Sequence, residues 1–209
     1  MAILIFLEGV NTCGKSVISE NLQDMLTKKG YSCENIHEKK ILDTFLPDNI
    51  TEEKNKSMLI KIFKDELKKD IDYIIFDRGY FSGLNYLNIN FEKFRNIDNL
   101  LAKNGAIVIL LHFDIKTIPK RIKNSLKYRE RDFIDYYNKL ISECKSSQEE
   151  DLALIKSYDS SMKGFIKNIE KSKMKHIKID VTNIYNKDSY SKIMGRILTF
   201  IIGKTRKKG

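Results

Sequence analysis

The stretch Gly9-Val10-Asn11-Thr12-Cys13-Gly14-Lys15-Ser16 decides the fold. It matches the pattern G-x-x-x-x-G-K-[ST], and it stands between a strand-like apolar run, Ile3 to Leu7, and a helical pattern that begins near Lys15. In that context the glycines let backbone N–H groups turn inward around phosphate groups, and the helix N-terminus adds positive potential. The stretch therefore predicts a phosphate-binding loop that takes ATP or GTP.

The loop also predicts which residues bind the nucleotide. Lys15 is expected to reach the β- and γ-phosphates, and the Ser16 hydroxyl is expected to bind Mg²⁺, the predicted cofactor. The expected nucleotide-binding residues of the loop are Gly9, Asn11, Thr12, Cys13, Gly14, Lys15, Ser16 and Val17.

Outside the loop, strand-length apolar runs alternate with segments of helical periodicity. This alternation is typical of βαβ units around a buried parallel sheet. Thr51 reads as the N-cap of an amphipathic helix with Glu52 and Glu53 in its first turn. The predicted fold is α/β, a three-layer fold of the P-loop NTPase type in a single domain, residues 1–209. The expected strands are Ile3–Leu7, Ser32–His37, Tyr73–Phe76, Ala106–Phe113 and His176–Val181.

Several classes of P-loop protein lack their diagnostic residues here. The guanine-recognising N-K-x-D is absent from the sequence, and no glycine has an aspartate three residues before it, so a GTPase is disfavoured. The Walker-B-like run Tyr73 to Asp77 ends in an acid that can hold the Mg²⁺ shell, but Arg78 follows it instead of a glutamate that would polarise water. The site is expected to transfer phosphate from ATP to a bound acceptor.

The sequence resembles the thymidylate kinases and the related deoxynucleoside kinases. Leu7-Glu8-Gly9 is similar to the family's I-E-G opening, and Asp77-Arg78, followed by Ser82 and Tyr86, is similar to its D-R-Y-x-x-S-x-x-A-Y-Q pattern. The resemblance implies that Arg78 holds the acceptor's phosphate and that Asp77 supports the metal. It also implies that Ser82 and Tyr86 bind the acceptor, together with Asn11, which replaces the acidic residue that thymidylate kinases carry in the loop.

A cluster of arginines follows the fourth strand. The run Arg129-Glu130-Arg131-Asp132, with Arg121 before it, is similar to the lid that these kinases close over the donor phosphates. We expect a lid at about residues 120–148 in which Arg129 and Arg131 are catalytic and Arg121 packs near the adenine or pairs locally. The alternative is a solvated charged helix.

Glu38 has three open roles. It lies after the second strand, where the thymidylate kinases show R-E-P and the nucleoside kinases x-E-P. It is a substrate-binding candidate that could act as the general base for a 5′-hydroxyl, as a metal-shell ligand or as a surface acid.

Composition limits the other partners. The net charge of +10 would suit a polyanion, but the lysines are spread along the chain, so nucleic acid is not expected to be the main partner. No apolar run approaches membrane-spanning length, and neither a secretory leader nor a disulfide framework is indicated, which favours the cytoplasm.

Residues 204–209 read as a solvated basic tail. The resemblance implies a homodimer, for which the amphipathic segment from Glu92 to Lys103 could supply the interface, although core packing explains the same pattern.

The leading hypothesis is transfer of the γ-phosphate of Mg-ATP to a deoxynucleoside monophosphate, with dTMP giving dTDP as the first choice. The first alternative is a deoxynucleoside kinase that uses Glu38 as base. The second is a P-loop kinase of nucleic-acid ends or a nucleotide-regulated binding module.

Overall fold

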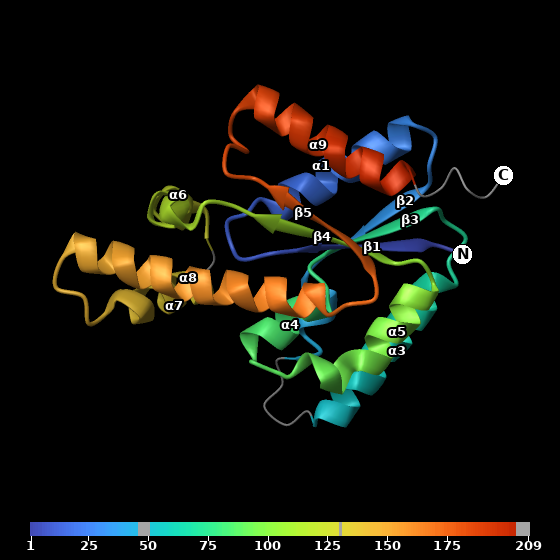
Figure 1. Ribbon diagram of the computed structural model, residues 1–209, viewed down its shortest axis with the longest axis horizontal. Coiled ribbons are helices and arrows are strands. Elements are labelled where there is room, and N and C mark those ends of the chain that lie inside the picture. Colours follow the sequence, from blue (N-terminus) through green and yellow to red (C-terminus); the bar gives the residue numbers. More distant parts are fainter. Residues whose placement is uncertain (46–50, 130, 204–209) are drawn as a thin grey trace.

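The computed structural model describes residues 1–45, 51–129 and 131–203. Within them a single parallel sheet runs through the centre of the molecule in the order β2-β3-β1-β4-β5 (Figure 1). Its strands are β1 (Ile3–Glu8), β2 (Cys33–Ile36), β3 (Tyr73–Asp77), β4 (Ile107–His112) and β5 (Lys175–Asp180). The five predicted strands are confirmed, each within one or two residues of its expected ends.

Helices cover both faces of the sheet and complete the predicted three-layer fold. One face carries α1 and α9, and the other carries α3, α4, α5 and α8 (Figure 1). The helices are α1 (Lys15–Lys28), α2 (Lys39–Leu42), α3 (Glu52–Leu67), α4 (Tyr80–Tyr86), α5 (Arg95–Lys103), α6 (Ile118–Ser125), α7 (Arg131–Ile141), α8 (Ser147–Glu170) and α9 (Lys187–Ile202), with short 3₁₀ turns at Phe91–Phe94, Ile115–Thr117 and Leu126–Tyr128.

The three central strands are buried on both faces, as a parallel sheet covered by helices requires. Every residue of β3 is buried, and so are the residues of β1 from Leu4 onward. These strands have continuous apolar runs because both of their faces are buried in the middle of the sheet, so neither face carries polar residues that would alternate with apolar ones.

Two predicted features of the helices have clear outcomes. Thr51 is the N-cap of α3, because its side chain accepts a hydrogen bond from the backbone N–H of Lys54. In α5 the apolar residues Ile97 and Leu101 are fully buried in the core of this chain. The apolar face that could have served a dimer is therefore used for packing within the chain.

The segment predicted as a lid, residues 120–148, spans most of α6, the turn after it, α7 and the start of α8. α7 and the first part of α8 project past the carboxyl edge of the sheet (Figure 1). Glu130 and the predicted basic tail, residues 204–209, lie outside the described residues. Among the helices that are described, none is both long enough and apolar enough to cross a membrane.

Strand register sets the position of the functional site. Leu7 of β1 lies opposite Asp77 of β3, and the backbone N–H of Arg78 donates to Leu7 O at 3.1 Å. The residues that follow β1 and β3 therefore meet at the carboxyl edge of the sheet.

Candidate active site

The phosphate-binding loop connects β1 to α1, as the sequence predicts. Its backbone takes positive φ at Gly9 (140°), Thr12 (66°) and Gly14 (86°). A Cβ on Gly9 would lie 2.5 Å from Leu111 O, and one on Gly14 would lie 2.8 Å from Ile184 Cδ1. Both glycines are therefore needed for conformation and for space, and they let the loop wrap closely before α1 begins.

Lys15 lies at the centre of this loop. Its side chain is buried, and Nζ donates to Gly9 O at 3.0 Å and to Val10 O at 2.9 Å. Burial, reinforced by the positive charge of Arg78, lowers the pKa of Lys15 from its usual value. Both of these acceptors are neutral carbonyl oxygens, so a phosphate group that entered the loop would give the buried ammonium an anionic partner.

Asp77 and Ser16 are the two predicted metal ligands. Asp77 ends β3 with a buried carboxylate whose Oδ1 has no hydrogen-bond partner among the described residues. Ser16 is exposed at the start of α1. A buried carboxylate oxygen without a donor, together with an accessible hydroxyl, fits a Mg²⁺ ion that also binds phosphate oxygens and water. Within the described part of the chain, no three His, Cys, Asp or Glu side chains gather into a site that would hold a metal alone.

Arg78 connects the phosphate loop to the residues that are predicted to bind the acceptor. Its guanidinium is buried and donates to Gly9 O at 3.3 Å, to the Tyr86 hydroxyl at 2.8 Å and to Asn11 Oδ1 at 2.5 Å. Its Nε also forms an ion pair with Glu38. Three other predicted acceptor-site residues, Asn11, Tyr86 and Glu38, are thus brought together around the Arg78 side chain.

The electrostatics of this cluster follow from the ion pair. Burial alone would lower the pKa of Arg78, but the neighbouring Tyr86 and Glu38 raise it above its usual value. Burial would likewise raise the pKa of Glu38, yet the charge and the hydrogen bond of Arg78 hold it below its usual value. Both groups are therefore ionised at neutral pH, and Glu38 is no mere surface acid.

Ser82 completes the acceptor side from α4. Its hydroxyl is fully buried, accepts from Arg78 at 3.5 Å and donates to Glu8 Oε2 at 2.6 Å. Glu8 was not among the predicted site residues. Burial raises its pKa to about 7, although Ser82, Arg78, Gly79 and Lys15 all act to lower it.

Tyr158 of α8 is a second residue that the sequence analysis missed. Its buried hydroxyl has no hydrogen-bond partner among the described residues. Burial, with Tyr136 and Tyr86 nearby, raises its pKa above the usual value, and the positive charge of Arg129 lowers it in part. In the sequence Tyr158 shares helical spacing with Leu154, Met162 and Phe165, so it reads as a core residue.

The arginines of the predicted lid have different positions. The Arg121 guanidinium is buried, stacks 4.4 Å from the ring centroid of Phe113, and donates to Thr12 O at 3.2 Å, Val181 O at 2.8 Å and Thr182 O at 2.7 Å. It pairs locally and holds the phosphate loop against the segment after β5. Among the described residues, Arg121 has its donors directed at protein oxygens.

Among the described residues, no hydrogen bond or ion pair joins Arg129 or Arg131 to the phosphate loop. The Arg129 guanidinium lies 4.9 Å from the Phe133 ring centroid. Arg131 has a side chain that is 92% exposed, and its Nε lies 3.8 Å from Asp135 Oδ2. Action of these two arginines on the donor phosphates would exchange these local contacts for phosphate oxygens.

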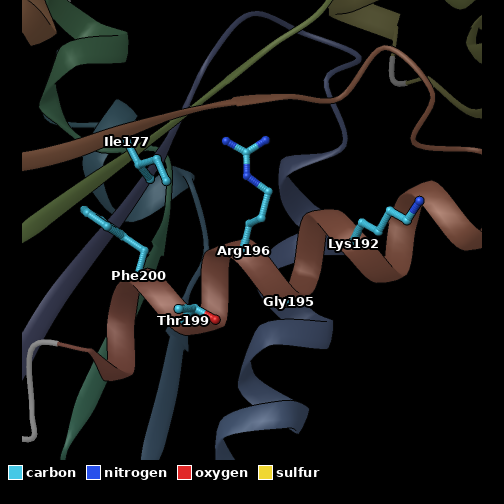
Figure 2. A pocket seen from close by; sticks show the side chains of 6 residues that line it. All are labelled: Ile177, Lys192, Gly195, Arg196, Thr199 and Phe200. Carbon is cyan, nitrogen blue, oxygen red and sulfur yellow. The ribbon is translucent and has the colours of Figure 1, made fainter.

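A hollow that is separate from the candidate active site lies between β5 and α9. It is lined by Ile177, Lys192, Gly195, Arg196, Thr199 and Phe200, with Arg196 projecting from α9 toward the strand (Figure 2). No phosphate-loop residue lines it, so it is separate from the candidate active site.

Comparison with known proteins supports the kinase interpretation. No family model matches the chain. The chain is 28% identical to a probable thymidylate kinase from Methanobrevibacter smithii over 146 residues, which is 62% of this chain and 74% of that protein.

Two solved structures share the fold. The YorR protein from Bacillus subtilis, in complex with phosphorylated GDP, superposes with a TM-score of 0.57 at 19% identity and covers 99% of both chains. Polyphosphate kinase 2 from Arthrobacter aurescens TC1 gives a TM-score of 0.57 at 17% identity over 98% of this chain and 69% of that one. These structures therefore support the three-layer α/β P-loop fold of this chain.

Proposed function

We propose that this P-loop phosphotransferase, a relative of thymidylate kinases, transfers the γ-phosphate of Mg-ATP to a deoxynucleoside monophosphate, with dTMP as the leading acceptor. The observation that carries the proposal is the buried Arg78 guanidinium, which contacts both Gly9 O of the phosphate loop and Asn11 and Tyr86 on the acceptor side. A planar, permanently charged donor in that position can bind an acceptor phosphate through two parallel hydrogen bonds.

The residues divide the chemistry between them. The loop N–H groups and Lys15 bind the donor phosphates, and Arg78 binds the acceptor phosphate, so that two anions are held together without repelling each other. Ser16 and Asp77 would hold Mg²⁺, which neutralises charge on the donor phosphates when bound. Arg129 and Arg131 would close over the donor, exclude water and stabilise charge on the transferred group.

One observation favours a deoxynucleoside kinase as a second candidate. Glu38 already forms an ion pair with Arg78, so a monophosphate has to displace that carboxylate or share the guanidinium with it. A nucleoside brings no phosphate and needs a base for its 5′-hydroxyl, and the lowered pKa of Glu38 keeps the carboxylate ionised for that role.

The deciding experiment is product analysis with ATP, Mg²⁺ and a panel of acceptors. The panel contains deoxynucleoside monophosphates, the matching nucleosides and an oligonucleotide with a free 5′-hydroxyl. The proposal predicts that dTMP has the highest kcat/KM, whereas a preference for thymidine would transfer the assignment to the second candidate. Phosphorylation of the oligonucleotide alone would point to a kinase of nucleic-acid ends.

Two variants test the roles of the acceptor-side residues within the same panel. If the acceptor is a monophosphate, Arg78→Ala should raise the acceptor KM steeply and lower kcat, while Glu38→Gln acts more weakly through substrate orientation. If the acceptor is a nucleoside, Glu38→Gln should be the more damaging change, because it removes the base.

A further inference from the structure

The carboxylate of Glu8 links the phosphate-loop strand to the start of α4. Glu8 is the last residue of β1 and its side chain is fully buried. Oε1 accepts from the backbone N–H of Gly79 at 2.9 Å, and Oε2 accepts from the Ser82 hydroxyl at 2.6 Å. One side chain thus accepts from Gly79 in the turn that carries Arg78 and from Ser82 in the helix that follows it.

That turn has a backbone that requires support. Arg78 takes φ +80°, a left-handed conformation that is strained for a residue with a side chain. Gly79 has no room for a side chain, because a Cβ there would lie 2.6 Å from Phe6 Cδ1 and 2.9 Å from Glu8 Oε1. The carboxylate of Glu8 and the ring of Phe6 therefore enclose the turn on the side facing β1.

The turn determines where the Arg78 guanidinium points. NH1 donates to Ser82 Oγ at 3.5 Å, and Ser82 in turn donates to Glu8, so a chain of hydrogen bonds runs from the guanidinium to the carboxylate. Among the described residues, the Glu8 carboxylate accepts from Gly79 and Ser82 and not from Asn11 or Tyr86, which are hydrogen-bond partners of Arg78.

We infer that Glu8 is a positioning residue for phosphoryl transfer: it fixes the left-handed Arg78 turn and thereby aims the guanidinium at the acceptor. This inference rests on the proposed function for its kinetic consequences. Its structural content, that the Glu8 carboxylate holds the segment from Arg78 to Tyr86, can be tested without turnover.

The test compares Glu8→Ala and Glu8→Gln with the wild type. Alanine removes both acceptors, whereas glutamine keeps a carbonyl oxygen for Gly79 N–H and an amide that can donate to Ser82. We expect Glu8→Ala to raise the acceptor KM and lower kcat by about 10-fold or more each, with the ATP KM changed by less than about 2-fold. Glu8→Gln should restore most of the acceptor KM.

Ile201→Ala supplies the control for a loss of stability alone. Ile201 is a buried core residue of α9, on the face of the sheet opposite α4 (Figure 1). Its truncation should lower stability without moving the acceptor KM of the folded fraction. If Glu8→Ala behaves as Ile201→Ala does, Glu8 only stabilises the fold and the inference is wrong.

Hydrogen exchange gives the readout that does not depend on activity. Peptides covering residues 78–86 should exchange about 10-fold faster in Glu8→Ala and at nearly the wild-type rate in Glu8→Gln. Unchanged exchange in Glu8→Ala overturns the inference whatever the kinetics. Faster exchange in a protein that phosphorylates no acceptor would overturn the proposed function and leave the positioning role of Glu8 intact.

Discussion

Replacing Arg78 by alanine should remove most of the catalytic efficiency without unfolding the protein. Of its donors, Nε faces Glu38, whereas NH1 faces Gly9 O and the Tyr86 hydroxyl and NH2 faces Asn11 Oδ1. An acceptor phosphate would take the place of the protein oxygens at NH1 and NH2 and accept two hydrogen bonds from them. At about 1.5–3 kcal/mol for each charge-assisted hydrogen bond, their loss costs ~3–6 kcal/mol, or about 10²–10⁴-fold in kcat/KM.

Two further variants separate this loss from an effect on folding. Arg78→Gly removes the same guanidinium but adopts φ +80° without strain, so it should be more stable than Arg78→Ala by about 1 kcal/mol and equally inactive. Arg78→Lys keeps the charge but cannot form the bidentate pair, and its activity should be intermediate.

The assay is initial-rate kinetics with dTMP varied at saturating Mg-ATP, together with urea unfolding of each variant. Arg196→Ala is the matched control, because Arg196 is an exposed arginine in the hollow beside α9, away from the loop. That control should retain wild-type kinetics. Arg78→Ala activity within about 3-fold of wild type would refute the assignment of Arg78 to the acceptor phosphate.

Three further predictions concern the rest of the site. Arg121→Ala removes the donors to Thr12 O, Val181 O and Thr182 O. It should lower the free energy of unfolding, measured by urea titration, by ~2–4 kcal/mol. A loss below about 0.5 kcal/mol would mean that Arg121 does not stabilise the loop. Because burial raises the pKa of Glu8 from 4.5 to about 7, the folded state binds this proton more tightly than the unfolded state. The stability of the wild type relative to Glu8→Gln should therefore be highest below about pH 4.5 and should fall as pH rises through about 7, by up to roughly 3 kcal/mol; a flat difference in thermal melts across that range would contradict it. Arg129→Ala combined with Arg131→Ala should lower kcat more than it weakens acceptor binding, and the segment from about Lys120 to Gln148 should gain hydrogen-exchange protection when ATP and acceptor bind. Unchanged kcat in the double variant would mean that the segment is a solvated charged helix.

The sequence predicts the layers of the fold because its signals are local. The apolar runs that became β1, β3 and β4 lie in the middle of the sheet, where both faces are buried and no alternation competes with the pattern. Thr51 caps α3 through an oxygen of its own side chain, so its role depends only on the residues beside it. The phosphate loop is equally local, since glycine spacing and the following helix define it.

The parts of the site that depend on distant contacts were harder to predict. The contact of Arg78 with Asn11 depends on the register between β1 and β3, and the resemblance placed both residues near the acceptor without showing that they touch. Glu8 looked like part of a family opening, because nothing in the sequence shows that Gly79 and Ser82 will meet it. Arg121 sits among charged residues, and only the fold reveals that it reaches carbonyl groups 60 and 109 residues away.

The most direct test of the central claim follows the γ-phosphate itself. Wild-type protein and Lys15→Ala are each incubated with γ-labelled ATP, Mg²⁺ and dTMP, and the labelled products are separated. We expect the wild type to place the label in dTDP in an amount equal to the ADP formed. We expect Lys15→Ala, which lacks the ammonium held at Gly9 O and Val10 O, to be slower by about 10³-fold or more. Label released only as inorganic phosphate, or near-wild-type transfer by Lys15→Ala, would contradict the claim.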